Sequence, residues 1–213
     1  MAGELSIISR SFYSCMDAVS IARELLGTIL YTEINPGEIT TGRIVETEAY
    51  MAPEDLACHA RGNKRTSRTE TMFARPGTAY VYKCYGIHDL FNLVTAPENV
   101  AHAILIRAIE PLKGIDLMAT RRKMDRKKVE LVNGPGKLTK ALGISTLHDG
   151  IDLASEFSPI QILKSEKAPN FKIIAGPRVG MSHHTKHCGH YPWRFRISGN
   201  RYTSLPKEVR YEW

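Results

Sequence analysis

The sequence predicts an α+β fold: a single domain, residues 1–213, with a mainly antiparallel sheet. Strand-like and helix-like segments are mixed without a regular β-α-β alternation, which argues against a parallel sheet. Short turn signals join several successive strand-like segments, as they do between antiparallel neighbours. A chain of 213 residues also suits one domain with a substantial core.

The first predicted helix covers residues 17–27, where Asp17 is a plausible N-cap and Gly27 stands where a C′ glycine would. Two strands follow at 28–33 and 40–50, with a turn signal at Pro36 and Gly37 between them. Residues 51–76 are polar, basic and weakly periodic. A loop of this length in a compact domain is usually functional or disordered.

Residues 77–199 carry eight further expected elements. A hairpin-like turn at Gly86 separates the strands expected at 77–86 and 89–95, and Pro135 lies near the first turn of the helix expected at 134–144. The expected strands are 77–86, 89–95, 102–111, 159–164, 170–176 and the end of 189–199, and the expected helices are 114–124 and 134–144.

Composition narrows the class of protein. Lys and Arg number 29 against 22 Asp and Glu, a net charge of +7 that suits a polyanionic partner but also many proteins without one. The four cysteines form no C-x-x-C pair, so we expect free thiols and an intracellular, reducing compartment. No apolar stretch predicts a membrane span, and residues 1–14 do not read as a secretory signal.

Residues 43–50, RIVETEAY, place unusual side chains together. Side chains alternate across a strand, so Glu46, Glu48 and Tyr50 share one face. That face is either solvated or the wall of a pocket. In a pocket, one carboxylate would be a candidate catalyst and the ring a candidate platform. Strand alternation alone does not choose between the two glutamates.

Other chemical motifs are weaker. There is no phosphate-binding P-loop, dinucleotide-binding glycine motif or G-x-S-x-G elbow. The stretch SHHTKHCGH places His183 and His187 four residues apart, as a metal site on a helix would. Gly189 and Pro192 argue against a regular helix there, so an exposed or DNA-facing loop is the preferred interpretation and no metal is expected.

Two basic runs and a group of tyrosines fit a nucleic-acid partner. The runs ARGNKRTSR and RRKMDRKK are either solvated faces or phosphate contacts, and the second also resembles a nuclear signal. Tyr80 and Tyr82 alternate onto one strand face, whereas Tyr85 falls at the turn. A tyrosine at a hairpin tip either packs on a neighbouring loop or acts as a wedge between base pairs.

Several long segments, in one order from about Phe12 to the C-terminal region, resemble the alkyladenine (3-methyladenine) DNA glycosylase family of the mammalian type. They are FYSCMDAVSIARELLG, RIVETEAYMAPEDLACHARG, MFARPGTAYVYKCYGIHDLFN, AILIRAIEP, NGPGKLTKALGI and GPRVG. The resemblance implies a curved, mainly antiparallel sheet with flanking helices and a protruding β-hairpin. It also implies a monofunctional enzyme that flips damaged purines out of duplex DNA and hydrolyses the N-glycosidic bond, starting base excision repair.

The resemblance assigns the catalytic roles residue by residue. The general base falls on Glu48, and Arg107 and the Val179 carbonyl match the groups that hold the attacking water. Tyr85 matches the side chain that fills the vacated stack. Glu48 and Tyr50 are neighbours on one strand face, roughly 6–7 Å apart along the strand. A base stacked on the Tyr50 ring would therefore have its glycosidic bond near Glu48.

The same resemblance assigns residues that contact the base and the DNA. Tyr50 and Tyr82 match the two stacking rings, His59 the hydrogen-bonding partner of the base, and Asn92 the group that excludes guanine. Weaker matches, in a variable loop and at the hairpin tip, suggest further DNA-binding positions: Lys64, Thr66, Met72 and Ile87.

The expected partner is double-stranded DNA with damaged purines of the 3-methyladenine, hypoxanthine or ethenoadenine type. We expect a monomer that needs no cofactor, no metal and no membrane, in bacterial cytoplasm or a nucleus. Two alternatives remain: a non-catalytic nucleic-acid-binding module, and a hydrolase of free nucleosides or RNA. The first would have lost part of the catalytic set, and the second would not need Tyr85 or the basic loops.

Overall fold

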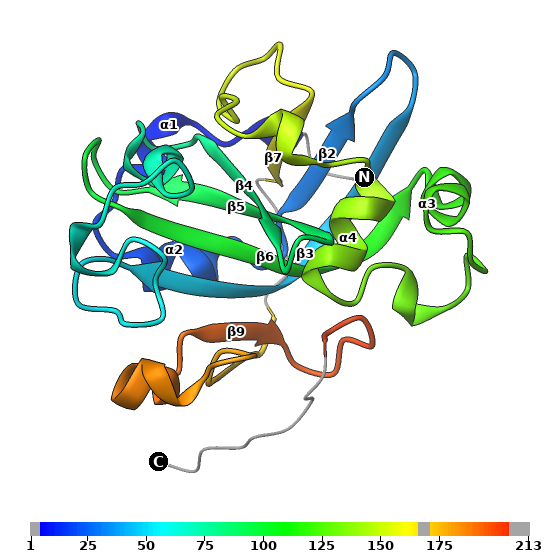
Figure 1. Ribbon diagram of the computed structural model, residues 1–213. Helices are drawn as coiled ribbons and strands as arrows, with labels where there is room; N and C mark the ends of the chain where they lie inside the picture. The colour runs from blue at the N-terminus through cyan, green and yellow to red at the C-terminus, as the bar shows by residue number, and fades with distance from the viewer. Residues whose placement is uncertain (1–4, 166–170, 205–213) are drawn as a thin grey trace.

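The computed structural model describes residues 5–165 and 171–204 and confirms the predicted α+β class (Figure 1). These residues form one nine-stranded sheet with antiparallel pairing, in the order β1-β7-β2-β3-β6-β5-β4, and β9 pairs with β3 and β8. The strands are β1 (Leu5–Ile7), β2 (Ile29–Glu33), β3 (Ile39–Met51), β4 (Ala79–Cys84), β5 (His88–Thr95), β6 (His102–Lys113), β7 (Ile160–Ser165), β8 (Ile173–Gly176) and β9 (Arg194–Ile197).

Short helices connect and cover these strands. The α-helices are α1 (Arg10–Tyr13), α2 (Ala18–Glu24), α3 (Ile115–Arg122) and α4 (Pro135–Leu142). The 3-10 helices are η1 (Arg61–Asn63), η2 (Glu70–Phe73), η3 (Val129–Leu131), η4 (Thr146–His148) and η5 (His183–His190). No helix within the described ranges is both long and apolar enough to cross a membrane.

The start of α2 follows its capping signal. The Asp17 side chain accepts hydrogen bonds from the backbone N–H groups of Val19 and Ser20, which satisfies two donors at the helix start. Gly27 has a φ of +91°, and a Cβ there would lie 2.7 Å from the Phe171 ring, so this turn requires glycine. The helix ends at Glu24, earlier than its predicted range.

β3 is the strand that organises the sheet. It pairs with β6 on one edge, and on the other edge with β2 and then, at residues 46–48, with β9. The Thr47 hydroxyl donates to the Ala22 carbonyl of α2, so Thr47 points to the α2 face. Alternation therefore directs Glu48 to the opposite face. Figure 1 shows α2 behind the sheet and α4 in front of it.

Two irregularities interrupt the β3–β6 ladder beside the glutamates. The pairing of Glu46 with Ala108 leaves Val45 as an extra residue on β3, and the next step leaves Arg107 as an extra residue on β6. The two insertions cancel, so the register is the same on both sides of them. Bulges redirect side chains locally, and the bulge on β6 carries an arginine.

The β4–β5 hairpin ends in a tight turn. Both central residues of the turn have positive φ, +49° at Tyr85 and +73° at Gly86, as in the type I′ turns that suit hairpins. The Ile87 N–H donates to the Cys84 carbonyl and closes the turn. A positive φ is unusual for tyrosine, and it places this side chain at the protruding tip.

Two apolar clusters hold the fold. The larger one joins the central strands to α2, α3 and α4. The smaller one fills the space between the sheet and residues 52–73, with Met72, Phe73 and Tyr80 among its members. Tyr50 and Tyr82 pack against the smaller cluster, so the segment predicted as a long loop helps to build the wall on which these rings lie.

Some predictions differ from the structure. Residues 51–76 contain η1 and η2 and bury part of their side chains, so they are more ordered than the polar sequence suggested. β1 and α1 were not predicted, because each is too short for a periodic pattern. The strand predicted at 170–176 begins at Ile173, and residue 170 lies outside the described residues.

Candidate active site

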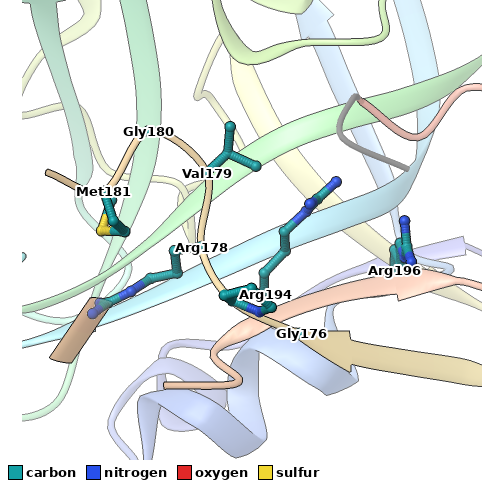
Figure 2. Close-up of a pocket in the computed structure, with 8 residues that line it drawn as sticks. Gly176, Arg178, Val179, Gly180, Met181, Arg194 and Arg196 are labelled. Carbon is teal, nitrogen blue, oxygen red and sulfur yellow. The ribbon is translucent and has the colours of Figure 1, made fainter. Parts of the chain in front are cut away.

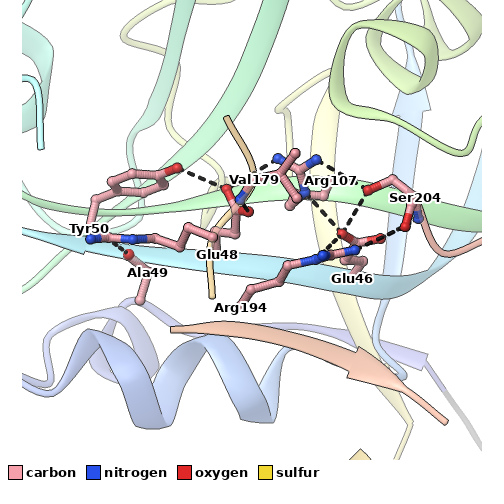
Figure 3. A network of polar contacts seen from close by, with 9 residues as sticks. Glu46, Glu48, Ala49, Tyr50, Arg107, Val179, Arg194 and Ser204 are labelled. Carbon is pink, nitrogen blue, oxygen red and sulfur yellow. Dashed lines mark hydrogen bonds and ion pairs between the residues drawn. The ribbon is translucent and has the colours of Figure 1, made fainter. Parts of the chain in front are cut away.

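Glu48 is buried beneath three hydrogen-bond donors from three different segments. The Tyr50 hydroxyl donates to Oε2 at 2.8 Å, Arg107 Nη1 donates to the same oxygen at 3.1 Å, and the Val179 N–H donates to Oε1 at 2.7 Å. Figure 3 shows these groups converging on the carboxylate. Glu48 has no exposed surface, so these groups separate it from solvent.

Glu46 lies two residues before Glu48 on β3, and apart from Arg107 it is bonded by different residues. Its Oε1 accepts from Arg107 Nε at 2.9 Å, Arg194 Nε at 2.7 Å and the Ser204 hydroxyl at 2.8 Å, and its Oε2 accepts from the Ser204 N–H (Figure 3). Glu46 therefore ties β6, β9 and the segment after β9 together. Two of its three partners, Arg107 and Arg194, are basic side chains.

Arg107 links the two carboxylates. Its guanidinium bonds both glutamates and the Ser204 hydroxyl, and only 7% of its side chain is exposed. Burial opposes its charge, but Glu48 and Glu46 outweigh burial and raise the pKa of Arg107. The bulge on β6 aims this side chain at both glutamates at once.

Tyr50 combines two functions in one side chain. Burial, and then the neighbouring Glu48 charge, raise the pKa of Tyr50 well above its ordinary value, so its hydroxyl stays protonated and can donate to Glu48. Its ring lines a pocket of about 440 Å³, a size typical of small-molecule sites. The arrangement couples the position of the ring to that of the carboxylate.

The pocket brings together all four of the predicted base-binding residues. Arg107 and Val179 line it near Glu48, and Tyr85 lines its rim. Neither Glu48 nor Glu46 lines the pocket itself. All three residues that donate to Glu48 line it, whereas Arg107 is the one residue that does so among the three described residues that donate to Glu46. The predicted base-binding side chains on the wall are Tyr50, His59, Tyr82 and Asn92.

An aromatic cluster forms one wall of the pocket. The Tyr80 and Tyr82 rings stack with centroids 5.3 Å apart, and His59 meets Tyr82 edge-on at 4.6 Å. His59 Nδ1 lies 3.0 Å from the Tyr80 hydroxyl. Burial, followed by the charges of Arg68 and Arg61, lowers the pKa of His59 to about 4, so this ring is neutral near pH 7.

The predicted DNA-binding positions separate into two groups. At the hairpin tip, Tyr85 is 90% exposed and Ile87 is 71% exposed, two apolar side chains that no neighbouring loop covers. Lys64 and Thr66 are exposed on the loop after η1. Met72, in contrast, is buried and lines the pocket, so a contact with DNA at this position would be with a nucleotide inside the pocket.

The His-rich stretch is a wall of the same pocket. η5 is interrupted at Lys186, which has a φ of +47°, in agreement with the expectation of no regular helix. His184 and Thr185 line the pocket together with the aromatic residues. Within the described ranges, no cluster of three His, Cys, Asp or Glu side chains has the geometry to hold a metal ion.

Several contributors to the site were not predicted. Tyr80 was noted only as a strand residue, and Arg178, Arg194 and Ser204 were not singled out. The sequence carried a partial signal for Arg178, because it stands next to Val179 in the segment GPRVG. Nothing in the sequence connects Ser204 with Glu46, which lies 158 residues earlier.

Comparison with known proteins gives the family of this chain. The sequence pattern of the family described as Methylpurine-DNA glycosylase (MPG) matches residues 11–201. A Bacillus cereus protein named "Putative 3-methyladenine DNA glycosylase" is 43% identical over 201 residues, which cover 91% of this chain and 97% of that protein. A Chlamydia felis protein of the same name is 43% identical over 193 residues, or 90% and 96% of the two chains. The resemblance identified from the sequence is therefore confirmed, and the chain belongs to the methylpurine-DNA glycosylase family.

Proposed function

We propose that this glycosylase takes an alkylated or deaminated purine out of duplex DNA and hydrolyses its N-glycosidic bond with a water molecule activated by Glu48. The observation that carries the proposal is the buried Glu48, bonded to three groups that line an aromatic pocket. Glu46 is less suited to this role, because two of the three residues that bond it lie away from the pocket.

The pocket suits a flat, electron-poor ring. Tyr50 and Tyr82 present aromatic surface, and base stacking on such rings is worth about 1–3 kcal/mol. His59 is neutral near pH 7 and therefore adds no positive charge against a cationic alkylated purine. These features support lesions of the 3-methyladenine, hypoxanthine and ethenoadenine type as substrates.

The chemistry needs a base more than an acid. An alkylated purine is already a good leaving group, so the enzyme must deprotonate water while the sugar gains oxocarbenium character. A carboxylate beside C1′ supplies the base and stabilises the developing positive charge. Because Tyr50, Arg107 and Val179 cover Glu48 in the free protein, the nucleotide and its water must displace one of these contacts as they bind.

The surface supports a flipping step. Tyr85 stands exposed at the hairpin tip and also reaches the rim of the pocket, so it can fill the stack from which a base has entered. Flipping costs a few kcal/mol, less at a damaged pair, and the wedge offsets part of this cost. Lys64 and Thr66 are exposed, and we propose that they contact phosphates of the duplex.

The pocket also supports a monofunctional reaction. None of the described residues that line it is a lysine, so it offers no amine nucleophile to form a Schiff base. The expected product is an abasic site in an uncut strand. Capture of a covalent protein–DNA adduct by borohydride would contradict this part of the proposal.

The decisive experiment measures excision from duplex oligonucleotides that each carry one 3-methyladenine, hypoxanthine or ethenoadenine. The native protein should release at least one of these bases, and Glu48→Gln should not. Release of free bases from nucleosides or RNA, with no release from duplex DNA, would favour the hydrolase alternative. Binding to duplex DNA without release of any damaged base would favour the non-catalytic module.

A further inference from the structure

Arg178 is a fully buried side chain whose two terminal nitrogens each donate to two acceptors, whereas its Nε has no hydrogen-bond partner among the described residues. It forms a two-pronged ion pair with Asp55, with Nη1–Oδ2 and Nη2–Oδ1 distances of 2.5 and 2.8 Å, and neither side chain has exposed surface. Nη1 also donates to the Ala49 carbonyl and Nη2 to the Cys188 carbonyl, each at 2.9 Å. The guanidinium thus joins β3, the segment after it and η5.

The Arg178 guanidinium also packs against the Tyr50 ring, on the side away from the pocket. Its central carbon lies 4.7 Å from the centroid of the Tyr50 ring and 5.1 Å from that of the Trp193 ring. Because Tyr50 also lines the pocket, its ring lies between the Arg178 guanidinium and the pocket. Asp55 balances the charge of the guanidinium, so the Tyr50 ring packs against an ion pair and not against an isolated cation.

Arg178 also precedes Val179, the residue whose N–H donates to Glu48. The loop that carries both lies against a cavity of about 220 Å³, which is lined by residues 176–181 and by Arg194 and Arg196. Figure 2 shows the Arg178 guanidinium directed away from that of Arg194. Direct packing against β9 therefore does not hold the loop along its length, and the Arg178 contacts anchor it.

We propose that Arg178, locked by Asp55, is a positioning residue that fixes both the Val179 N–H and the Tyr50 ring around Glu48. It touches neither the carboxylate nor the pocket base site directly, and it acts through its neighbour in the chain and through the ring it supports. The inference rests on the proposed function of Glu48, and it adds a residue that sets how well the carboxylate and the ring are aligned.

The test compares Arg178→Ala with Arg43→Ala. Arg43 on β3 is the control: it also pairs with a carboxylate, Glu110 at 2.9 Å, and lies over a ring, Phe171, at 5.8 Å, but this ion pair is about 30% exposed and does not line the pocket. Excision is measured in single turnovers at saturating enzyme, with binding to abasic product DNA measured separately. Hydrogen exchange of the Val179 amide reports the loop without reference to activity.

The Arg178→Ala variant should excise roughly 10- to 100-fold more slowly, as expected when a hydrogen bond to a charged group is lost. Product binding should change less than the rate, and the Val179 amide should exchange faster. Added guanidinium ion should occupy the vacated space and restore part of the rate, whereas sodium chloride at equal ionic strength should not. Arg43→Ala should show none of these effects.

The proposal fails if Arg178→Ala is folded and excises like the native protein, or if sodium chloride restores the rate as well as guanidinium. If this variant does not fold, Asp55→Asn is used, since it keeps the shape of the partner and removes the charge that locks the guanidinium; native rates and native exchange there would also overturn the proposal. A native protein that excises nothing, while the exchange contrast persists, would refute the proposed function instead.

Discussion

Separate exchange of Glu46 and Glu48 for glutamine tests which carboxylate performs the chemistry. The two glutamates and the two arginines that bond them, Arg107 and Arg194, are almost completely buried and together carry no net charge. Either exchange leaves one uncompensated positive charge in nearly the same place. The two variants are therefore matched in shape and charge and differ in which network they disturb.

The expected magnitudes follow from these networks. Removal of one partner from a buried ion pair costs about 3–5 kcal/mol of unfolding free energy, so both variants should lose stability to a similar extent. Loss of a general base slows a reaction by about 10²–10⁴-fold, which is about 3–5 kcal/mol of activation free energy, so Glu48→Gln should lose nearly all excision. Glu46→Gln leaves all three donors to Glu48 in place and weakens one bond to Arg107, a loss of about 1 kcal/mol or about fivefold.

The assay combines urea unfolding with single-turnover excision, at a temperature where both variants are folded. The expected result is similar unfolding free energies and rates that differ by at least about tenfold. Equal rates in two folded variants would refute the assignment of the base to Glu48 alone. A much larger loss of stability in only one variant would refute the argument from matched charge.

Three further variants test other parts of the site. Tyr85→Ser should weaken flipping, measured by the fluorescence of an extrahelical base analogue, while single-turnover excision from an already unpaired lesion stays close to native; an unchanged flipping equilibrium would remove the wedge role. Tyr50→Phe keeps the ring but loses a hydrogen bond to a charged group, so excision should fall roughly 10- to 100-fold with little change in product binding. His59 has a folded-state pKa of about 4 against about 6.5 when unfolded, so the unfolded chain takes up the proton first as pH falls. Native stability should therefore decline between about pH 6.5 and about pH 4, on the order of 2 kcal/mol more than in His59→Gln, as urea unfolding would show.

Much of the architecture followed from local signals in the sequence. The cap at Asp17, the turn at Gly86 and the alternation of Tyr80 with Tyr82 each depend on neighbours in the chain, and each prediction is confirmed. β1 and α1 escaped because their three or four residues derive their order from packing against distant segments rather than from a periodic pattern.

The candidate site was less predictable from the sequence than the fold. Alternation placed Glu46, Glu48 and Tyr50 together but treated the glutamates as equivalent, and only family resemblance selected one. What separates them is contributed by residues far away in the sequence: Val179 bonds only Glu48, whereas Arg194 and Ser204 bond only Glu46. Such contacts leave no local trace, because the sequence gives no reason for a backbone bulge to aim an arginine at two carboxylates.

The paired bulges on β3 and β6 have a consequence for how this protein can diverge. Because the side-chain period of a strand is two, loss of one residue from either strand would shift its pairing and turn the following side chains to the opposite face. Glu48 and Tyr50 would then point toward α2 instead of the pocket. A compensating loss from the partner strand would restore the register. Changes in the length of these two strands must therefore occur in pairs.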